Sequence, residues 1–145
     1  MKLKYRKAVF VLAYAKTRKG NEYLLLKRRL HWFGWEFPKG AVKFLETGKM
    51  ASRRELREET GLKSLKIIKF NFSGKYDYEK ILSDRQKFRG QTFSLYSAEV
   101  KKSKVKIDNY EHSDYKWVSF SQALKMLKHK DQKKSLKIVD EFLRE

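Results

Sequence analysis

The stretch that decides the fold of this chain runs from Gly40 to Leu62 and has the sequence GAVKFLETGKMASRRELREETGL. It predicts a turn followed by a helix over residues 47–60. Thr47 can cap the start of this helix, because its hydroxyl can accept a hydrogen bond from a free backbone amide of the first turn. Gly61 can end the helix in a left-handed conformation that residues with a Cβ atom resist.

The end of this predicted helix carries three clustered carboxylates, those of Glu55, Glu58 and Glu59. Their spacing of i, i+3 and i+4 places them on one helical face. Clustering three negative charges is unfavourable unless a cation or arginines lie among them. If the cation is a metal ion, ligation by oxygen atoms alone suits Mg²⁺ or Mn²⁺ better than zinc. A solvated charged face is the ordinary alternative for carboxylates at this spacing.

The whole stretch resembles the Nudix box, G-x5-E-x7-R-E-U-x-E-E-x-G-U with U aliphatic, and it fills every fixed position of that pattern. The resemblance implies an enzyme that hydrolyses a nucleoside diphosphate linked to another group. It also implies an α/β fold in which a mixed β-sheet is sandwiched between α-helices (α/β/α). Because the chain has the length of one ordinary domain, we expect residues 1–145 to form a single Nudix hydrolase domain.

The family pattern also implies the metal ligands and the cofactor. Glu55, Glu58 and Glu59 would hold Mg²⁺ or Mn²⁺, helped by backbone carbonyl groups near Lys39 and Gly40. Divalent ions neutralise the phosphate oxygens and acidify the attacking water. Either Glu55 or Glu58 could accept the proton of that water, and the residues do not rank the two.

Two further charged residues of the stretch, Arg54 and Glu46, have supporting roles. Arg54, which we count with the catalytic residues, is expected to anchor a glutamate through a forked contact. Glu46 is expected to be structural, since the helix dipole favours a carboxylate at the helix start. Outside the stretch, Glu111 is the best candidate for another metal ligand, because its segment resembles the E-x4-W-V sequence of related hydrolases with one residue more before Trp117. Glu99 is a weaker rival.

Short segments at residues 35–40 (WEFPKG) and 89–91 (RGQ) resemble asymmetrical diadenosine tetraphosphate hydrolases and RNA pyrophosphohydrolases. This resemblance implies hydrolysis of diadenosine tetraphosphate to ATP and AMP. The alternatives are an RNA 5′-end pyrophosphohydrolase or decapping enzyme, a hydrolase of oxidised nucleoside triphosphates, and a non-catalytic nucleic-acid-binding Nudix domain.

Candidate substrate-binding residues fall into two chemical groups. Positive charge near the box can bind a polyphosphate bridge, and aromatic faces can stack on a base. The cations are Arg28, Lys39 and Lys43, and the aromatic residues are Tyr76, Tyr78 and Phe88.

The net charge of the chain is +19. One interpretation is a surface that steers a polyanionic partner, which would be a small nucleotide polyphosphate, an RNA 5′ end or an inositol polyphosphate. The other is a general loading of the surface with lysine, as in hot habitats. The absence of cysteine excludes disulfides and thiolate metal sites. It is compatible with a reducing compartment but does not place the protein, which we expect to be cytoplasmic. The residues do not specify an oligomeric state.

The three histidines, His31, His112 and His129, match none of the short ligand spacings of metal sites. We therefore expect them to be isolated residues on polar surface. For His112 alone, a place near the substrate is the alternative.

The N-terminal sequence MKLKYRKAVFVLAYAK imitates a secretory signal, but its short apolar run is rich in β-branched and aromatic residues. It therefore predicts a strand over residues 5–17. No run is long enough to span a membrane. Residues 73–90 are expected to be a mobile loop, and a change of hydrophobic period after residue 121 predicts two C-terminal helices. Further strands are expected at residues 22–29, 65–72, 91–100 and 115–118.

Overall fold

The computed structural model describes residues 3–79 and 82–145. The strands are β1 (Lys4–Thr17), β2 (Gly20–Arg28), β3 (Gly34–Glu36), β4 (Lys39–Ala41), β5 (Lys66–Asp77), β6 (Phe88–Glu99) and β7 (His112–Val118). The helices are α1 (Gly48–Thr60), α2 (Phe120–Met126) and α3 (Lys130–Arg144).

The strands described form one mixed sheet in the order β3-β2-β1-β6-β5, to which β4 adds by pairing with β1 and β7 by pairing with β2. Strands β1 and β6 run parallel along most of their length, whereas the other pairs are antiparallel. The first half of β1 pairs with β4 and its last residues pair with β2. The same edge of β1 is therefore paired first with β4 and then with β2, and the candidate site lies near the point where the partner strand changes.

The buried centre of β1 explains why its sequence is apolar without interruption. Successive side chains of a strand point to opposite faces, so a strand covered on both faces needs apolar residues at every position. Val9, Val11 and Ala13 pack with Leu56 of α1. The alternate residues of β1 belong to the second core, which includes Leu136 of α3.

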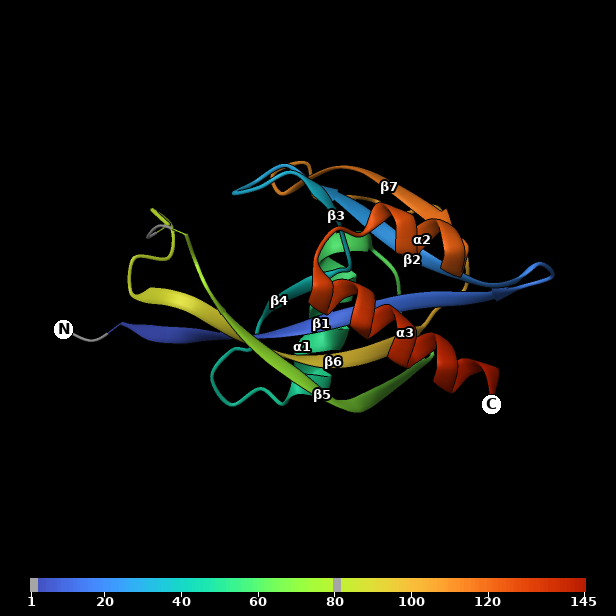
Figure 1. Ribbon diagram of the computed structural model, residues 1–145, viewed down its shortest axis with the longest axis horizontal. Helices are drawn as coiled ribbons and strands as arrows, with labels where there is room; N and C mark the ends of the chain where they lie inside the picture. The colour runs from blue at the N-terminus through green and yellow to red at the C-terminus, as the bar shows by residue number, and fades with distance from the viewer. Residues whose placement is uncertain (1–2, 80–81) are drawn as a thin grey trace.

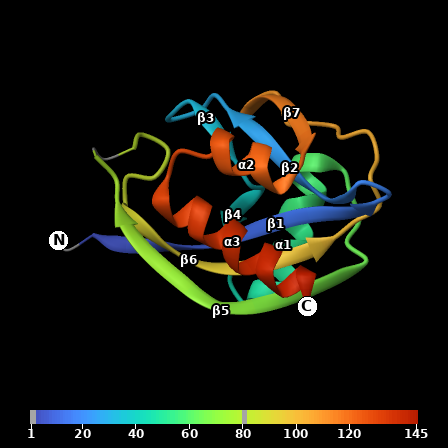
Figure 2. The ribbon, with the colours of Figure 1, turned by 45° about the vertical axis from the view of Figure 1, so that its right-hand side comes forward.

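Helix α1 covers one face of the sheet, and α2 and α3 cover the other (Figures 1 and 2). This arrangement confirms the predicted α/β fold with a mixed sheet between helices. No helix in the described part of the chain is long and apolar enough to cross a membrane.

The predicted loop over residues 73–90 is wrong at both ends. Strand β5 continues to Asp77 and β6 begins at Phe88, so Tyr76 pairs with Gln91 inside the sheet. The alternation of Phe70, Phe72 and Tyr76 with polar residues carried this signal, because β5 is an edge strand with one covered face. Residues 80–81 of the predicted loop lie outside the described residues.

Candidate active site

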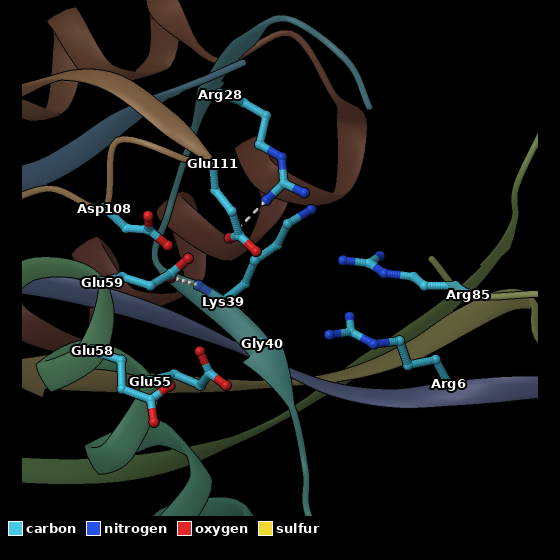
Figure 3. A pocket seen from close by; sticks show the side chains of 10 residues that line it. All are labelled: Arg6, Arg28, Lys39, Gly40, Glu55, Glu58, Glu59, Arg85, Asp108 and Glu111. Atoms are coloured by element: carbon cyan, nitrogen blue, oxygen red, sulfur yellow. Dashed lines mark hydrogen bonds and ion pairs between the residues drawn. The ribbon is translucent and has the colours of Figure 1, made fainter. Parts of the chain in front are cut away.

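The candidate site is a cavity of about 170 Å³ between α1, β4 and the segment that precedes β7. Carboxylates from α1 form one wall, and two arginines approach from the opposite side (Figure 3). The residues that line the cavity are Arg6, Arg28, Lys39, Gly40, Glu55, Glu58, Glu59, Arg85, Asp108 and Glu111.

Helix α1 is capped as its sequence predicts, which fixes where its carboxylates point. Thr47 accepts a hydrogen bond from the Met50 amide at 3.1 Å, and Gly61 ends the helix with a φ of 75°. Glu55, Glu58 and Glu59 all reach the cavity. The predicted common face of the three carboxylates is therefore present.

The three carboxylates differ in burial, and this difference affects their protonation. The Glu58 side chain is 54% exposed, whereas that of Glu59 is 5% exposed. Burial raises the pKa of Glu59 well above its usual value, and the negative charge of Glu36 adds to the effect. Burial also raises the pKa of Glu55. A cation in the cavity would favour the ionised form of these groups.

Arg54 makes the forked contact that its position predicts. Its Nε and Nη2 donate to the two carboxylate oxygens of Glu46 at 2.8 and 2.9 Å, and Nη2 also donates to the Ala41 carbonyl at 2.7 Å. Its Nη1 donates to Glu55 at 2.6 Å and to Glu58 at 3.2 Å. One guanidinium thus ties the loop before α1 to two carboxylates of the site.

Strand β4 contributes backbone rather than side chains to the acidic wall. The Lys39 amide donates to Glu59 Oε1 at 2.7 Å. A Cβ atom at Gly40 would overlap the carboxylate of Glu55, so a side chain here would displace that carboxylate from its present position. The predicted help of backbone carbonyl groups near Lys39 and Gly40 in metal binding stays a prediction, because the contact seen here is made by the Lys39 amide.

Arg28 lies in the cavity wall, but its side chain is only 1% exposed. Its Nη1 donates to Glu36 and to Glu111 at 3.3 Å each, and its Nε donates to the Leu30 carbonyl at 2.7 Å. The predicted role as a substrate cation therefore fits poorly, because two carboxylates already neutralise the guanidinium. Its position is better suited to hold Glu111 at the cavity.

Three of the lining residues, Arg6, Arg85 and Asp108, are absent from the sequence predictions. Arg6 Nη1 donates to Gln91 Oε1, and Arg85 Nη1 donates to the Tyr78 hydroxyl, both at 3.2 Å. Neither arginine has an ion-pair partner in the described ranges. Burial and the charge of Arg85 lower the pKa of Arg6. Two guanidinium groups without an ion-pair partner, opposite a carboxylate wall, can chemically bind an anion such as a phosphate.

A second cavity, of about 450 Å³, adjoins the first through Lys39, which lines both. Its walls are mainly aromatic and apolar, and Tyr76 and Tyr78 are among the residues that line it. The full lining is Phe10, His31, Trp32, Lys39, Tyr76, Asp77, Tyr78, Glu79, Leu82, His129, Lys130, Asp131 and Gln132. Such a surface can hold the planar base of a nucleotide.

The remaining sequence candidates lie outside both cavities. Lys43 is exposed in the loop before α1, and Phe88 begins β6 beneath the ammonium of Lys87. Glu99, the rival of Glu111, ends β6 and pairs with Lys16 at 3.8 Å. Glu111, by contrast, lines the acidic cavity, and its role as a metal ligand stays a prediction.

The prediction that His112 is a surface residue is wrong. The first residue of β7 is fully buried, with its Nε2 2.8 Å from Glu36 Oε2 and its Nδ1 3.9 Å from Glu59 Oε2. The spacing of His112 from the other histidines could not predict this position, because the residues next to its ring are glutamates from other elements. One ligand atom from each of Glu59, Glu111 and His112 lies within 4.8 Å of the others.

The NUDIX domain model matches residues 4–142 of the chain. The chain therefore belongs to the Nudix family of hydrolases, and the family prediction is confirmed.

Two enzymes with different substrates in their names are similar to this chain. The asymmetrical bis(5′-nucleosyl)-tetraphosphatase of Mus musculus is 34% identical over 125 residues, which cover 84% of this chain and 80% of that enzyme. An RNA pyrophosphohydrolase of Nitratiruptor sp. is 34% identical over 91 residues, and the match spans 59% of each chain.

Solved structures show the same fold at lower identity. A NUDIX hydrolase of Listeria monocytogenes has a TM-score of 0.79 at 20% identity, with 94% of this chain and 93% of that chain covered. A C. elegans Ap4A hydrolase, solved as a binary complex, has a TM-score of 0.74 at 22% identity, with 96% and 98% covered.

Proposed function

We propose that this Nudix hydrolase cleaves the phosphate bridge of a dinucleoside polyphosphate with the help of Mg²⁺ or Mn²⁺, and that diadenosine tetraphosphate is split into ATP and AMP. The observation that carries the proposal is the junction of two unlike cavities at Lys39. One is charged and suits metal-bound phosphates, and the other is aromatic and suits a base. A substrate that joins a polyphosphate to a nucleoside would occupy both.

The acidic wall fits a divalent ion. Its donors are carboxylate oxygens, the ligands that Mg²⁺ and Mn²⁺ prefer, and the buried Glu59 Oε2 has no hydrogen-bond partner among the described residues. Glu55, Glu58, Glu59 and Glu111 would hold the ions, together with the backbone of Gly40. When bound, such ions neutralise phosphate charge and acidify water.

The side chains of the cavity supply the rest of the chemistry. In the hydrolysis, a water oxygen bonds to phosphorus, a bridging P–O bond breaks, and the proton of the water passes to a carboxylate. Glu55 or Glu58 would accept this proton, and we favour Glu55 because its side chain is more enclosed, at 13% exposed against 54% for Glu58. Arg6 and Arg85 would bind the phosphate oxygens on the opposite wall.

The aromatic cavity would hold one nucleoside. Tyr76 and Tyr78, both predicted as stacking residues, line it, and their rings meet edge to face at a centroid distance of 6.3 Å. The Tyr78 hydroxyl also donates to Gln91 at 3.2 Å while it accepts from Arg85. Tyr78 would therefore join the base site to the phosphate site.

A second candidate function, RNA 5′-end pyrophosphohydrolysis or decapping, is favoured by the net charge of +19 and by the similarity to RNA pyrophosphohydrolases. RNA offers many phosphates to a basic surface, and such binding weakens steeply with added salt. Under either function, we expect residues 1–145 to act as one domain and the protein to reside in the cytoplasm.

Product analysis separates the two functions. The full chain is incubated with Mg²⁺ and equimolar diadenosine tetraphosphate and 5′-triphosphorylated RNA, and the products are resolved by chromatography. The proposal expects ATP and AMP to form far faster than pyrophosphate from RNA. Faster release from RNA, with a steep loss of rate on added salt, would replace it by the second function. No turnover of either substrate would refute both.

A further inference from the structure

His112 occupies an unusual position for a histidine, because it is fully buried next to the acidic cavity. It follows Glu111 directly and begins β7, where it pairs in register with Arg28 at the end of β2. Its imidazole lies between the carboxylates of Glu36 and Glu59. A buried polar ring without full hydrogen bonding costs free energy, so each of its two nitrogens calls for a partner.

The Nε2 atom has such a partner. It lies 2.8 Å from Glu36 Oε2, and Glu36 is held in turn by Arg28 and Lys39 at 3.3 Å each. Burial alone would raise the pKa of Glu36, but Lys39, the hydrogen bond from His112 and Arg28 together lower it to about 2. Because an ionised carboxylate can only accept, Nε2 carries the hydrogen and donates it.

The Nδ1 atom has no hydrogen-bond partner in the described part of the chain, and neither has the facing Glu59 Oε2. The two atoms are 3.9 Å apart, which is too long for a hydrogen bond. The same distance suits two ligands of one metal ion, since bonds of about 2.1 Å place two ligands about 3.0–4.2 Å apart. A carboxylate that fixes the far nitrogen of a histidine is also the usual support of a metal-ligating imidazole.

We infer that His112 Nδ1 is a metal ligand, which acts together with Glu59 and Glu111 to form a mixed nitrogen and oxygen site in this chain. The ligand atoms of the three residues lie within 4.8 Å of one another, so side-chain shifts of a few tenths of an ångström would bring them around one ion. The inference rests on the proposed metal-dependent function and changes its metal chemistry. An imidazole ligand strengthens the preference of a site for transition metals such as Co²⁺, Ni²⁺ or Zn²⁺, whereas carboxylate ligands alone suit Mg²⁺ or Mn²⁺.

Pulsed EPR of the full chain loaded with Mn²⁺ tests the inference without reference to turnover. Protein with ¹⁴N-histidine is compared with protein in which only the histidines carry ¹⁵N. We expect the Mn²⁺ signal to show modulation by a nitrogen nucleus, and this modulation should change between the ¹⁴N and ¹⁵N samples. It should be lost in the His112→Gln variant and should persist in the matched variant His129→Gln. His129 is an exposed residue between α2 and α3.

Bound Mn²⁺ without isotope-sensitive modulation in the unmodified chain would overturn the inference, as would modulation that survives in a folded His112→Gln variant. If that variant does not fold, isotope-sensitive modulation that persists in both His31→Gln and His129→Gln would assign the ligand to His112. Calorimetric titration should also show that His112→Gln weakens Co²⁺ binding about tenfold or more and Mg²⁺ binding much less. Equal losses for both ions would count against a nitrogen ligand.

The two proposals can fail independently. A chain that hydrolyses diadenosine tetraphosphate but shows no histidine coupling would retain the proposed function and lose the nitrogen ligand. A chain that binds Mn²⁺ through His112 but cleaves no nucleotide would retain the metal site and lose the proposed function.

Discussion

Replacing Arg54 by lysine keeps a positive charge at the site but removes the planar fork. The five hydrogen bonds of Arg54 reach Glu46 twice and Ala41, Glu55 and Glu58 once each. A lysine ammonium is a single point of charge and cannot satisfy these acceptors in their present geometry. We therefore expect Arg54→Lys to weaken both the fold and the alignment of the carboxylates.

The size of the effect on stability follows from the contact with Glu46. Hydrogen bonds to charged groups contribute about 1.5–3 kcal/mol each, but lysine can retain one, and the Arg54 side chain is 20% exposed. We expect the free energy of unfolding to fall by about 2 kcal/mol. For a domain of this size, that loss lowers the melting temperature by roughly 4–8 °C. Turnover should fall by about tenfold to a hundredfold, because Glu55 and Glu58 lose a shared donor.

Urea denaturation of Arg54→Lys, Glu46→Gln and the double variant measures this coupling. The cycle should give an interaction energy of about 1–2 kcal/mol between the two side chains. A single-variant loss below about 0.5 kcal/mol, with additive effects in the double variant, would refute the structural role of the fork.

The same pair predicts a pH dependence. The hydrogen bonds from Arg54, opposed by burial, lower the pKa of Glu46 from 4.5 to about 2. A carboxylate whose pKa is lowered by folding stabilises the fold above its unfolded pKa, and this contribution is lost as the pH falls toward the folded value. The free energy of unfolding of the unmodified chain should therefore fall more steeply than that of Glu46→Gln between about pH 5 and pH 2. Equal slopes of the two stability curves in this pH range would contradict the proposed contact between Arg54 and Glu46.

Four further substitutions test the site, each in a folded variant checked by circular dichroism. Glu58→Gln should reduce turnover on the order of a hundredfold or more, because it removes a metal-binding charge. Near-normal initial rates would refute the proposed role of Glu58 as a metal ligand. Arg85→Gln should raise KM for a tetraphosphate more than it lowers kcat, and an unchanged KM would exclude phosphate binding. Gly40→Ala should cut kcat about a hundredfold by displacing a catalytic carboxylate, whereas normal kinetics would show that the overlap is relieved elsewhere. Tyr76→Leu should weaken nucleotide binding in fluorescence titrations by about tenfold, and inorganic triphosphate binding should stay unchanged if the ring contacts only the base.

The helix that carries the acidic wall could be predicted from the sequence with its caps. Thr47, Gly61 and the three glutamates lie close together in the chain, so the geometry of a single helix fixes how they are arranged. The forked contact of Arg54 was also predictable, because Glu46 lies only eight positions earlier, in the loop that leads into the same helix. The central strand was equally clear, since burial on both faces demands apolar residues throughout.

The sequence alone therefore determined the family, the fold class and the carboxylate wall of the site, all of which rest on local patterns. Only the tertiary structure decided what faces that wall. His112 meets Glu36 from 76 positions away, and Arg6 meets Gln91 from 85 positions away, across strands whose pairing no local pattern specifies. The register of β1 with β6 and the registers of β2 with β3 and β7 bring these residues together, and a shift of one residue would turn each to the other face of the sheet.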